Sequence, residues 1–208
     1  DMRKPSLRKT AAILFIVVLL AGLAACGGDE DPDGRIVKIN DEAITNGQFE
    51  NFCTLWLYTQ GFDPSEPLTS DQKSLALGDM INAEALRQYY EKEDPSVFSN
   101  SYQSSLDTFL NQMKTGNAEF LSSHDISDED IEFYYMSQYL TETCFDKIRS
   151  EQEEDVLAEE AKKYYDEHEA EFRGETFDES LEEIYYLLYS EMYDQKLKEI
   201  KDDMTIEK

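Results

Sequence analysis

Apolar residues recur at helical spacing along most of the chain, and this pattern limits the possible folds more than any other feature. Between Ser70 and Lys92, one side of a helix would carry the apolar side chains of Leu77, Met80, Ile81 and Ala85, with Leu75 and Leu86 at its margins. Similar stripes occur in the segments 45–58, 94–114, 127–150, 156–172 and 177–200. The sequence therefore predicts a mainly α fold built from long amphipathic helices.

Local signals place several helix starts. In a capping box, an N-cap hydroxyl and an acid or amide three residues later satisfy each other's backbone N–H groups. Such boxes occur at Thr45–Gln48 and at Thr176–Glu179. Ser127 precedes three acidic residues that favour the positive end of a helix. Asp94–Pro95 predicts a further start, and Thr-Gly-Asn at 115–117 predicts a break.

A minor β element is expected at the two ends of the helical part. Arg35–Asn40 alternates, with Val37 and Ile39 on one face, and is followed by a polar turn and a brief extended segment. Thr205–Glu207 is expected to form a short strand after the last helix. We predict that this segment pairs with Val37–Ile39.

The N-terminal segment has the three-part order of a bacterial lipoprotein signal peptide. Residues 2–9 carry four basic side chains, an apolar run covers 11–20, and Ala24-Ala25-Cys26 follows. Residues 1–25 are therefore expected to be removed between Ala25 and Cys26, with a lipid on the Cys26 thiol. The alternatives are an ordinary signal peptide or an N-terminal membrane helix with a chance cysteine. The apolar run is short for a membrane span. We expect an extracytoplasmic protein held at the cell membrane by this lipid.

The charge of the chain excludes one class of partner. The chain contains 19 basic and 46 acidic residues, and removing residues 1–25 leaves 15 basic and 45 acidic ones. A surface this negative repels nucleic-acid phosphates and anionic lipid headgroups, and it attracts cations or basic partners. Nucleic-acid binding is therefore not expected.

Residues 26–34 form an acidic segment that we interpret as a tether between the lipid and the folded part. The same segment resembles the start of an EF-hand calcium loop, because Asp29, Asp31 and Asp33 are spaced as D-x-D-x-D-G. The twelfth position is Asn40 instead of the glutamate that closes such a loop, and Pro32 lies inside it. A plain solvated tether is the simpler interpretation.

Two cysteines, Cys53 and Cys144, remain after the lipid-modified one. A disulfide between them is possible in an extracytoplasmic compartment. Two buried free thiols, which behave as small apolar side chains, are the alternative. The sequence leaves both possibilities open.

The sequence contains no clear catalytic, metal or cofactor site. The only histidines, His124 and His168, are far apart and lie in acidic surroundings, whereas a metal site needs converging ligands. Neither a glycine-rich phosphate loop nor a nucleophile elbow is present. No catalytic residue, metal ligand or cofactor is therefore predicted.

Three segments resemble the N-terminal helical domain of PrsA-type lipoprotein foldases and SurA-type periplasmic chaperones. They are Val37–Phe49, Ile126–Ile131 and Ala161–Phe172, which match the family's opening strand and helix, its next long helix and its Tyr-Tyr…Phe segment. Asp41 departs from the glycine that is usual in the turn. The resemblance implies a SurA/PrsA N-terminal-like helical domain over 35–172. It also implies a long returning C-terminal helix in 173–208 that packs back on this domain.

One departure from the family matters for function. A parvulin prolyl-isomerase domain would follow Phe172, but only Arg173-Gly174-Glu175 separates that residue from the last capping box. The expected function is therefore an ATP-independent, holdase-like chaperone for unfolded or secreted polypeptides, without enzyme activity. A binding or scaffold lipoprotein for one dedicated partner is the alternative, and a residual isomerase is a third, weaker possibility.

Four adjacent tyrosine pairs suggest where client polypeptides would bind. Neighbours on a helix point about 100° apart, so one member of each pair should reach the core and the other its edge. Together with the single tryptophan, the candidate client-contact residues are Trp56, Tyr90, Tyr135 and Tyr186. Ordinary core and boundary residues are the alternative interpretation. A concave apolar groove between the first and last helices would favour client binding.

Overall fold

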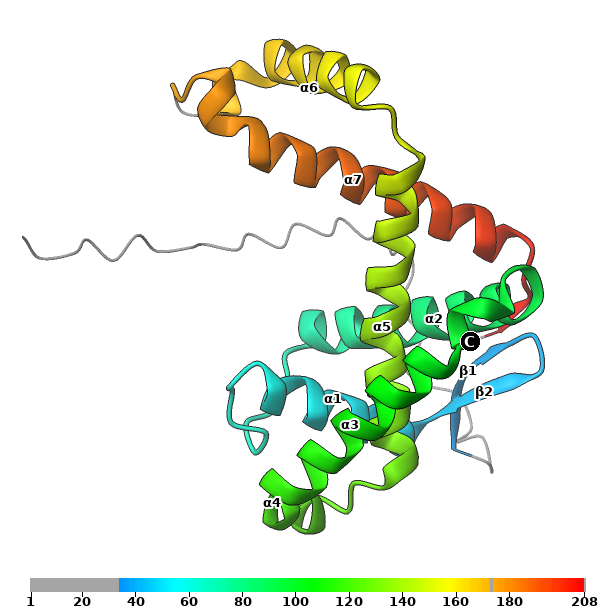
Figure 1. Ribbon diagram of the computed structural model, residues 1–208. Coiled ribbons are helices and arrows are strands. Elements are labelled where there is room, and N and C mark those ends of the chain that lie inside the picture. Colours follow the sequence, from blue (N-terminus) through cyan, green and yellow to red (C-terminus); the bar gives the residue numbers. More distant parts are fainter. Residues whose placement is uncertain (1–33, 173, 208) are drawn as a thin grey trace, which may run out of the picture. The chain divides into compact units, whose positions relative to one another are not determined.

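The computed structural model describes residues 34–172 and 174–207, and this part of the chain is mainly helical with one small sheet (Figure 1). Its elements follow in the order β1 (Arg35–Ile39), β2 (Glu42–Thr45), α1 (Asn46–Thr59), α2 (Ser70–Glu93), α3 (Asn100–Gly116), α4 (Ala118–Ser123), α5 (Asp128–Glu151), α6 (Glu154–His168), α7 (Phe177–Asp202) and β3 (Ile206–Glu207). Short 3-10 turns cover Pro95–Phe98 and Glu169–Phe172. The predicted mainly α class with a minor β element is confirmed.

Several predictions concern residues outside the described part. These are the signal segment 1–25, the cleavage and lipidation site at Ala25 and Cys26, and the candidate calcium ligands Asp29, Asp31 and Asp33. Gly34, the last residue of the expected tether, is described and has a left-handed backbone with φ of 64°. In the described ranges, no helix is both long enough and apolar enough to span a membrane.

The sheet joins the two ends of the described chain. Its strand order is β2-β1-β3, and both pairs are antiparallel. Lys38 lies opposite Glu207, and Ile39 lies opposite Ile206. The predicted pairing of the C-terminal segment with Val37–Ile39 is therefore confirmed.

The helix starts follow the predicted capping signals. Thr45 caps α1, Ser127 caps α5 and Thr176 caps α7, each in a complete capping box. A fourth box, Thr69 with Gln72, begins α2 and was not predicted. Since each box satisfies backbone donors that the first helical turn leaves free, four of the helices have well-defined starts.

Two predicted helix boundaries were wrong. The helix expected to begin at Asp94 begins later, at Asn100. One 3-10 turn and an extended Ser99 come before it. The Val97 carbonyl accepts a hydrogen bond from the Tyr139 hydroxyl at 3.1 Å, so it is bonded to α5 and not to a continuing helix. The helix expected to reach Phe172 ends at His168, and a 3-10 turn then buries the Phe172 side chain between α6 and α7.

The described residues bury three hydrophobic clusters. The first lies between the sheet, α1, α2 and α5, and includes Ile39, Leu55 and Met80. The second lies between α2, α5 and the C-terminal half of α7, and includes Leu86 and Leu140. The third lies between α6 and the N-terminal half of α7. α2 packs against α1, α5, α7 and β1, so it is buried on more than the one side that the predicted stripe covers. Leu86, which was predicted at the margin of that stripe, is fully buried.

Candidate functional site

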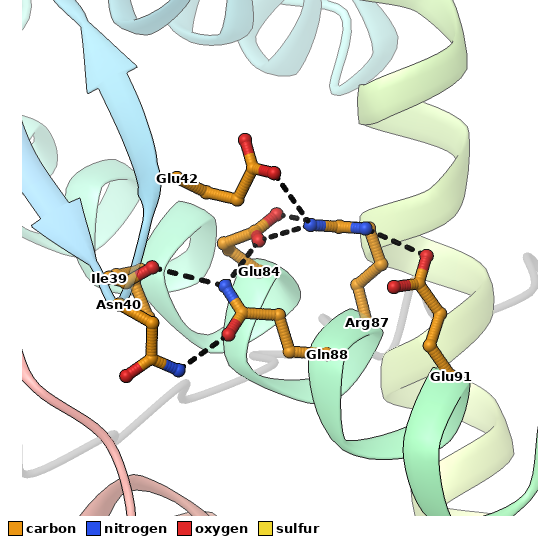
Figure 2. A network of polar contacts seen from close by, with 7 residues as sticks. All are labelled: Ile39, Asn40, Glu42, Glu84, Arg87, Gln88 and Glu91. Atoms are coloured by element: carbon orange, nitrogen blue, oxygen red, sulfur yellow. Dashed lines mark hydrogen bonds and ion pairs between the residues drawn. The ribbon is translucent and has the colours of Figure 1, made fainter.

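The most connected polar group of the described part lies where α2 meets the turn between β1 and β2 (Figure 2). The Glu84 carboxylate accepts hydrogen bonds from Arg87 Nε at 2.9 Å, from Arg87 Nη2 at 2.6 Å and from Gln88 Nε2 at 2.7 Å. Arg87 also donates to Glu91 at 2.7 Å, and its Nη2 lies 3.8 Å from a carboxylate oxygen of Glu42.

The same group holds the turn and the C-terminal segment. Gln88 donates to the Ile39 carbonyl at 3.1 Å and accepts from Asn40 Nδ2 at 2.6 Å. Asn40 has a left-handed backbone with φ of 53°, which asparagine tolerates better than most residues. Its backbone N–H donates to the Thr205 carbonyl at 2.7 Å, and its side-chain oxygen accepts from Thr205 N at 2.9 Å.

This network stabilises the fold and offers no reactive group. Glu84 is only 6% exposed, so its charge is buried and its oxygens are occupied by Arg87 and Gln88. The hydrogen bond to Glu84 raises the pKa of Arg87, so this guanidinium stays charged. Because buried charges are tolerated when they are paired and hydrogen-bonded, we interpret the network as a fastening between α2, the turn and β3.

A cleft of about 360 Å³ lies beside the network, between the C-terminal ends of α2 and α7. Its cations are already paired, because Lys92 lies 2.8 Å from Glu93 and Lys196 lies 3.9 Å from Glu199. The Lys196 ammonium also lies over the Tyr89 ring, 5.3 Å from its centroid. The cleft therefore presents mixed and neutralised charge to a ligand.

The two cysteines are buried free thiols, which is the second of the two alternatives left open by the sequence. Cys53 belongs to the first hydrophobic cluster and Cys144 to the second. Burial raises the pKa of Cys53 to about 11 and also raises that of Cys144. Both side chains therefore act as small apolar groups and not as nucleophiles.

The four candidate client-contact residues differ in how far the structure exposes them. The prediction that Tyr90 contacts clients is wrong, because its side chain is 3% exposed and lies inside the second cluster. Its neighbour Tyr89 is the more exposed member of the pair. Trp56 is half-buried against the first cluster. Tyr135 is half-buried, and its ring packs near Tyr139 and Phe109. Tyr186 is 52% exposed.

A groove between the first and last helices would have favoured client binding, but neither cleft described here is lined by both α1 and α7. Both helices pack on α2. A smaller cleft of about 180 Å³ lies between the N-terminal ends of α1 and α5, where Phe52 and Phe133 are among its lining residues. The outer faces of the helices therefore remain as candidate client-binding surfaces.

A helical hairpin is formed by α6, the 3-10 turn Glu169–Phe172 and the N-terminal half of α7. Together with the joint that connects α5 to α6, we call it the acidic arm (residues 151–191). Sixteen of its residues are acidic and three are basic. It buries the third cluster, to which Leu157, Ala161 and Ile184 contribute, and α6 packs chiefly on α7. In this part of the chain, acidic side chains surround a core contributed by two helices.

Large exposed apolar side chains concentrate on the acidic arm. Across the described ranges, the exposed ones are Phe62 at 59%, Val156 at 48% and Tyr186 at 52%, and the last two lie on the arm. The histidines lie apart, and the ring Nδ1 of each donates to a backbone carbonyl four residues earlier, His124 to Phe120 at 3.0 Å and His168 to Tyr164 at 2.9 Å. No cluster of three potential metal ligands occurs among the residues that the structure describes.

Comparison with known proteins gives no further assignment. No protein-family model matches the chain, and neither a curated protein nor a solved structure is significantly similar to it. The candidate site therefore rests on the residues themselves. Among the surfaces described, the acidic arm combines exposed apolar side chains with a large excess of negative charge.

Proposed function

We propose that this protein is a lipid-anchored, extracytoplasmic holdase-like chaperone for unfolded or secreted polypeptides. It would act without ATP and without prolyl-isomerase activity. In this proposal residues 1–25 are the signal peptide, Cys26 carries the lipid and 26–34 are the tether. Residues 35–172 form a SurA/PrsA N-terminal-like domain, and 173–208 return to it.

The order of the elements supports this proposal. A strand, a turn, a second strand and a capped helix open the described part, as in the resemblance drawn from Val37–Phe49. The last helix packs on α2 and α5 and leads into β3, which pairs with β1. Phe172 is separated from the cap of α7 by only three residues, so the family's catalytic domain has no place at this position.

The single observation that carries the proposal is the pair of exposed apolar side chains, Val156 and Tyr186, on the acidic arm. Exposed apolar groups give weak affinity for many unfolded chains because apolar contact is not directional. The surrounding carboxylates keep the protein soluble and attract basic segments of a client. A holdase needs both properties, and the acidic arm carries both.

An aggregation-suppression assay tests the function. We expect the chain from Gly27 onward to reduce light scattering of several unrelated unfolded proteins, at about equimolar amounts. The double variant Val156→Ser, Tyr186→Ser should lose most of this activity, whereas Phe62→Ser, which removes an equally exposed apolar group outside the arm, should keep it. Failure to suppress any of the clients would refute the chaperone proposal and leave the one-partner scaffold as the better interpretation.

The lipid anchor can be tested by the variant Cys26→Ser. Without the thiol no diacylglycerol can be attached, so we expect the protein to move from the membrane fraction to the soluble fraction. Helicity measured by circular dichroism should stay unchanged, because the described fold begins at Gly34. If Cys26→Ser still sediments completely with membranes, the anchor is not a lipid on this residue.

A further inference from the structure

α7 packs with different faces along its length. Ile184 and Leu188 belong to the third cluster, against α6, whereas Leu197 and Ile200 belong to the second cluster, against α2 and α5. At roughly 100° per residue, Ile184 and Leu197 point about 140° apart. Tyr189 packs against both clusters and lies where the buried face changes.

The face of α7 that packs on the body continues into the acidic arm without a partner. α7 crosses α5 near the C-terminal end of α5, where the Arg149 guanidinium lies over the Tyr189 ring at 5.6 Å (Figure 1). Tyr186 precedes Leu197 by eleven residues, so the two side chains point within about 20° of each other. Since α5 ends at Glu151, this face is uncovered at Tyr186, which is 52% exposed.

The surroundings of Tyr186 are acidic and contain unpaired carboxylates. Glu179, Glu182 and Glu183 lie on the same side of α7 and are exposed. In the described ranges, no lysine or arginine forms an ion pair with Glu182 or Glu183, because the lysines of α6 pair within that helix. The Tyr186 ring likewise has no stacking or cation partner among the described residues.

Several other tyrosine rings of this protein already hold a cation. Arg149 lies over Tyr189, Lys162 lies 5.4 Å from the Tyr165 centroid and Lys196 lies 5.3 Å from that of Tyr89. A cation is attracted to the negative face of an aromatic ring, and nearby carboxylates strengthen the attraction. Tyr186 has the same kind of ring in acidic surroundings, and a binding partner could supply the cation that lies over it.

We propose that the face of α7 formed by Glu179, Glu182, Glu183 and Tyr186 binds basic segments of unfolded secreted polypeptides. A lysine or arginine of the client lies over the Tyr186 ring, and neighbouring basic side chains pair with Glu182 and Glu183, while Glu179 adds negative charge although it also caps α7. This inference rests on the proposed function and names the class of client segment. From Glu179 to Tyr186 the face extends roughly 10 Å, which three or four residues of an extended chain span.

A fluorescent peptide with arginine at every second or third position and leucine or serine between tests this site. Full-length protein in a nonionic detergent should bind it, and the same peptide with citrulline in place of arginine should bind at least tenfold more weakly. The variant Glu182→Gln, Glu183→Gln, Tyr186→Ser should lower the affinity about tenfold. Glu159→Gln, Glu160→Gln on the outer face of α6 removes the same charge, and it should change the affinity less than twofold in 0.15 M salt, where charges are screened beyond about 8 Å.

Each outcome of the experiment decides for or against the site. Equal losses in the α6 and α7 variants would overturn it, because general electrostatic attraction would then explain binding. Full affinity in Tyr186→Ser alone, with helicity unchanged, would also overturn the role of the ring. If the peptide does not bind but aggregation is still suppressed, this inference fails and the proposed function stands. If the peptide binds and no client is protected, the proposed function fails.

Discussion

Replacing Glu84 by alanine is expected to lower the free energy of unfolding by about 3 kcal/mol. The substitution leaves the Arg87 guanidinium and the Gln88 amide without their common acceptor, at a place where Glu84 is 6% exposed. Removing one partner of a buried pair costs about 3–5 kcal/mol, and we expect the lower end because Arg87 is 23% exposed and keeps Glu91. Chemical denaturation followed by circular dichroism measures the change.

Glu91→Ala is the matched control for this prediction. It removes another carboxylate that pairs with Arg87 on the same helix, but Glu91 is 51% exposed. An exposed ion pair contributes roughly 0–1 kcal/mol, so this variant should unfold almost like the original protein. If Glu84→Ala and Glu91→Ala destabilise the protein equally, Glu84 does not have the fastening role that Figure 2 suggests.

Helix starts were predictable because they depend on a few neighbouring residues. Thr45 with Gln48, and Thr176 with Glu179, satisfy backbone donors within one turn, and no distant contact is needed. The pairing of β3 with β1 was predictable for a different reason. Val37 and Ile39 alternate toward a core, and the short C-terminal segment supplies the missing edge partner.

The burial of particular side chains was less predictable, because it depends on which helices surround a given helix. α2 is contacted from several sides, so Tyr90 is buried although it lies off the predicted stripe. Glu84 lies on the face of that stripe, seven residues after Leu77, but apolar spacing does not predict the burial of a carboxylate there. A signal for Glu84 was nevertheless present. Arg87 and Gln88 follow at three and four residues, where they can satisfy a carboxylate that lies between two small buried side chains, Ala83 and Ala85.

The acidic arm was visible in the sequence only as an excess of charge. Their spacing predicts one stripe for the apolar residues of 177–200, but in the structure those of the first half pack against α6 and those of the second half against α2 and α5. Periodicity within one helix cannot show this division, because both halves are amphipathic. The exposed position of Tyr186 follows from the crossing of α7 over the end of α5, which is a tertiary contact.

Asp79 gives the second large prediction, which concerns pH. This carboxylate lies on α2. Its negative charge helps to raise the pKa of the Tyr134 hydroxyl on α5 and that of the Tyr193 hydroxyl on α7. No hydrogen bond or ion pair reaches it within the described residues. Burial raises its pKa from 3.8 to about 6. The ionised form is therefore disfavoured at the junction of α2, α5 and α7.

The direction of the pH effect follows from the raised pKa. Between about pH 4 and 6 the folded protein binds a proton at Asp79 that the unfolded chain does not, so this group adds stability as the pH falls through 6. At pH 8 the same group destabilises the fold. A shift of about two pKa units at about 1.4 kcal/mol each predicts that Asp79→Asn is more stable than the original protein by about 2–3 kcal/mol at pH 8.

The difference between the two proteins across pH isolates this one group from the other carboxylates. It should be largest at pH 8 and should fall to about 0.5 kcal/mol near pH 4, where Asp79 of the folded protein is neutral and resembles asparagine in shape and charge. Asp107→Asn, at an exposed position on α3, should shift stability by less than about 0.5 kcal/mol at either pH. A stability difference for Asp79→Asn that does not depend on pH would mean that Asp79 does not titrate between the folded and unfolded states as its burial requires. The junction of α2, α5 and α7 would then tolerate the ionised carboxylate without loss of stability.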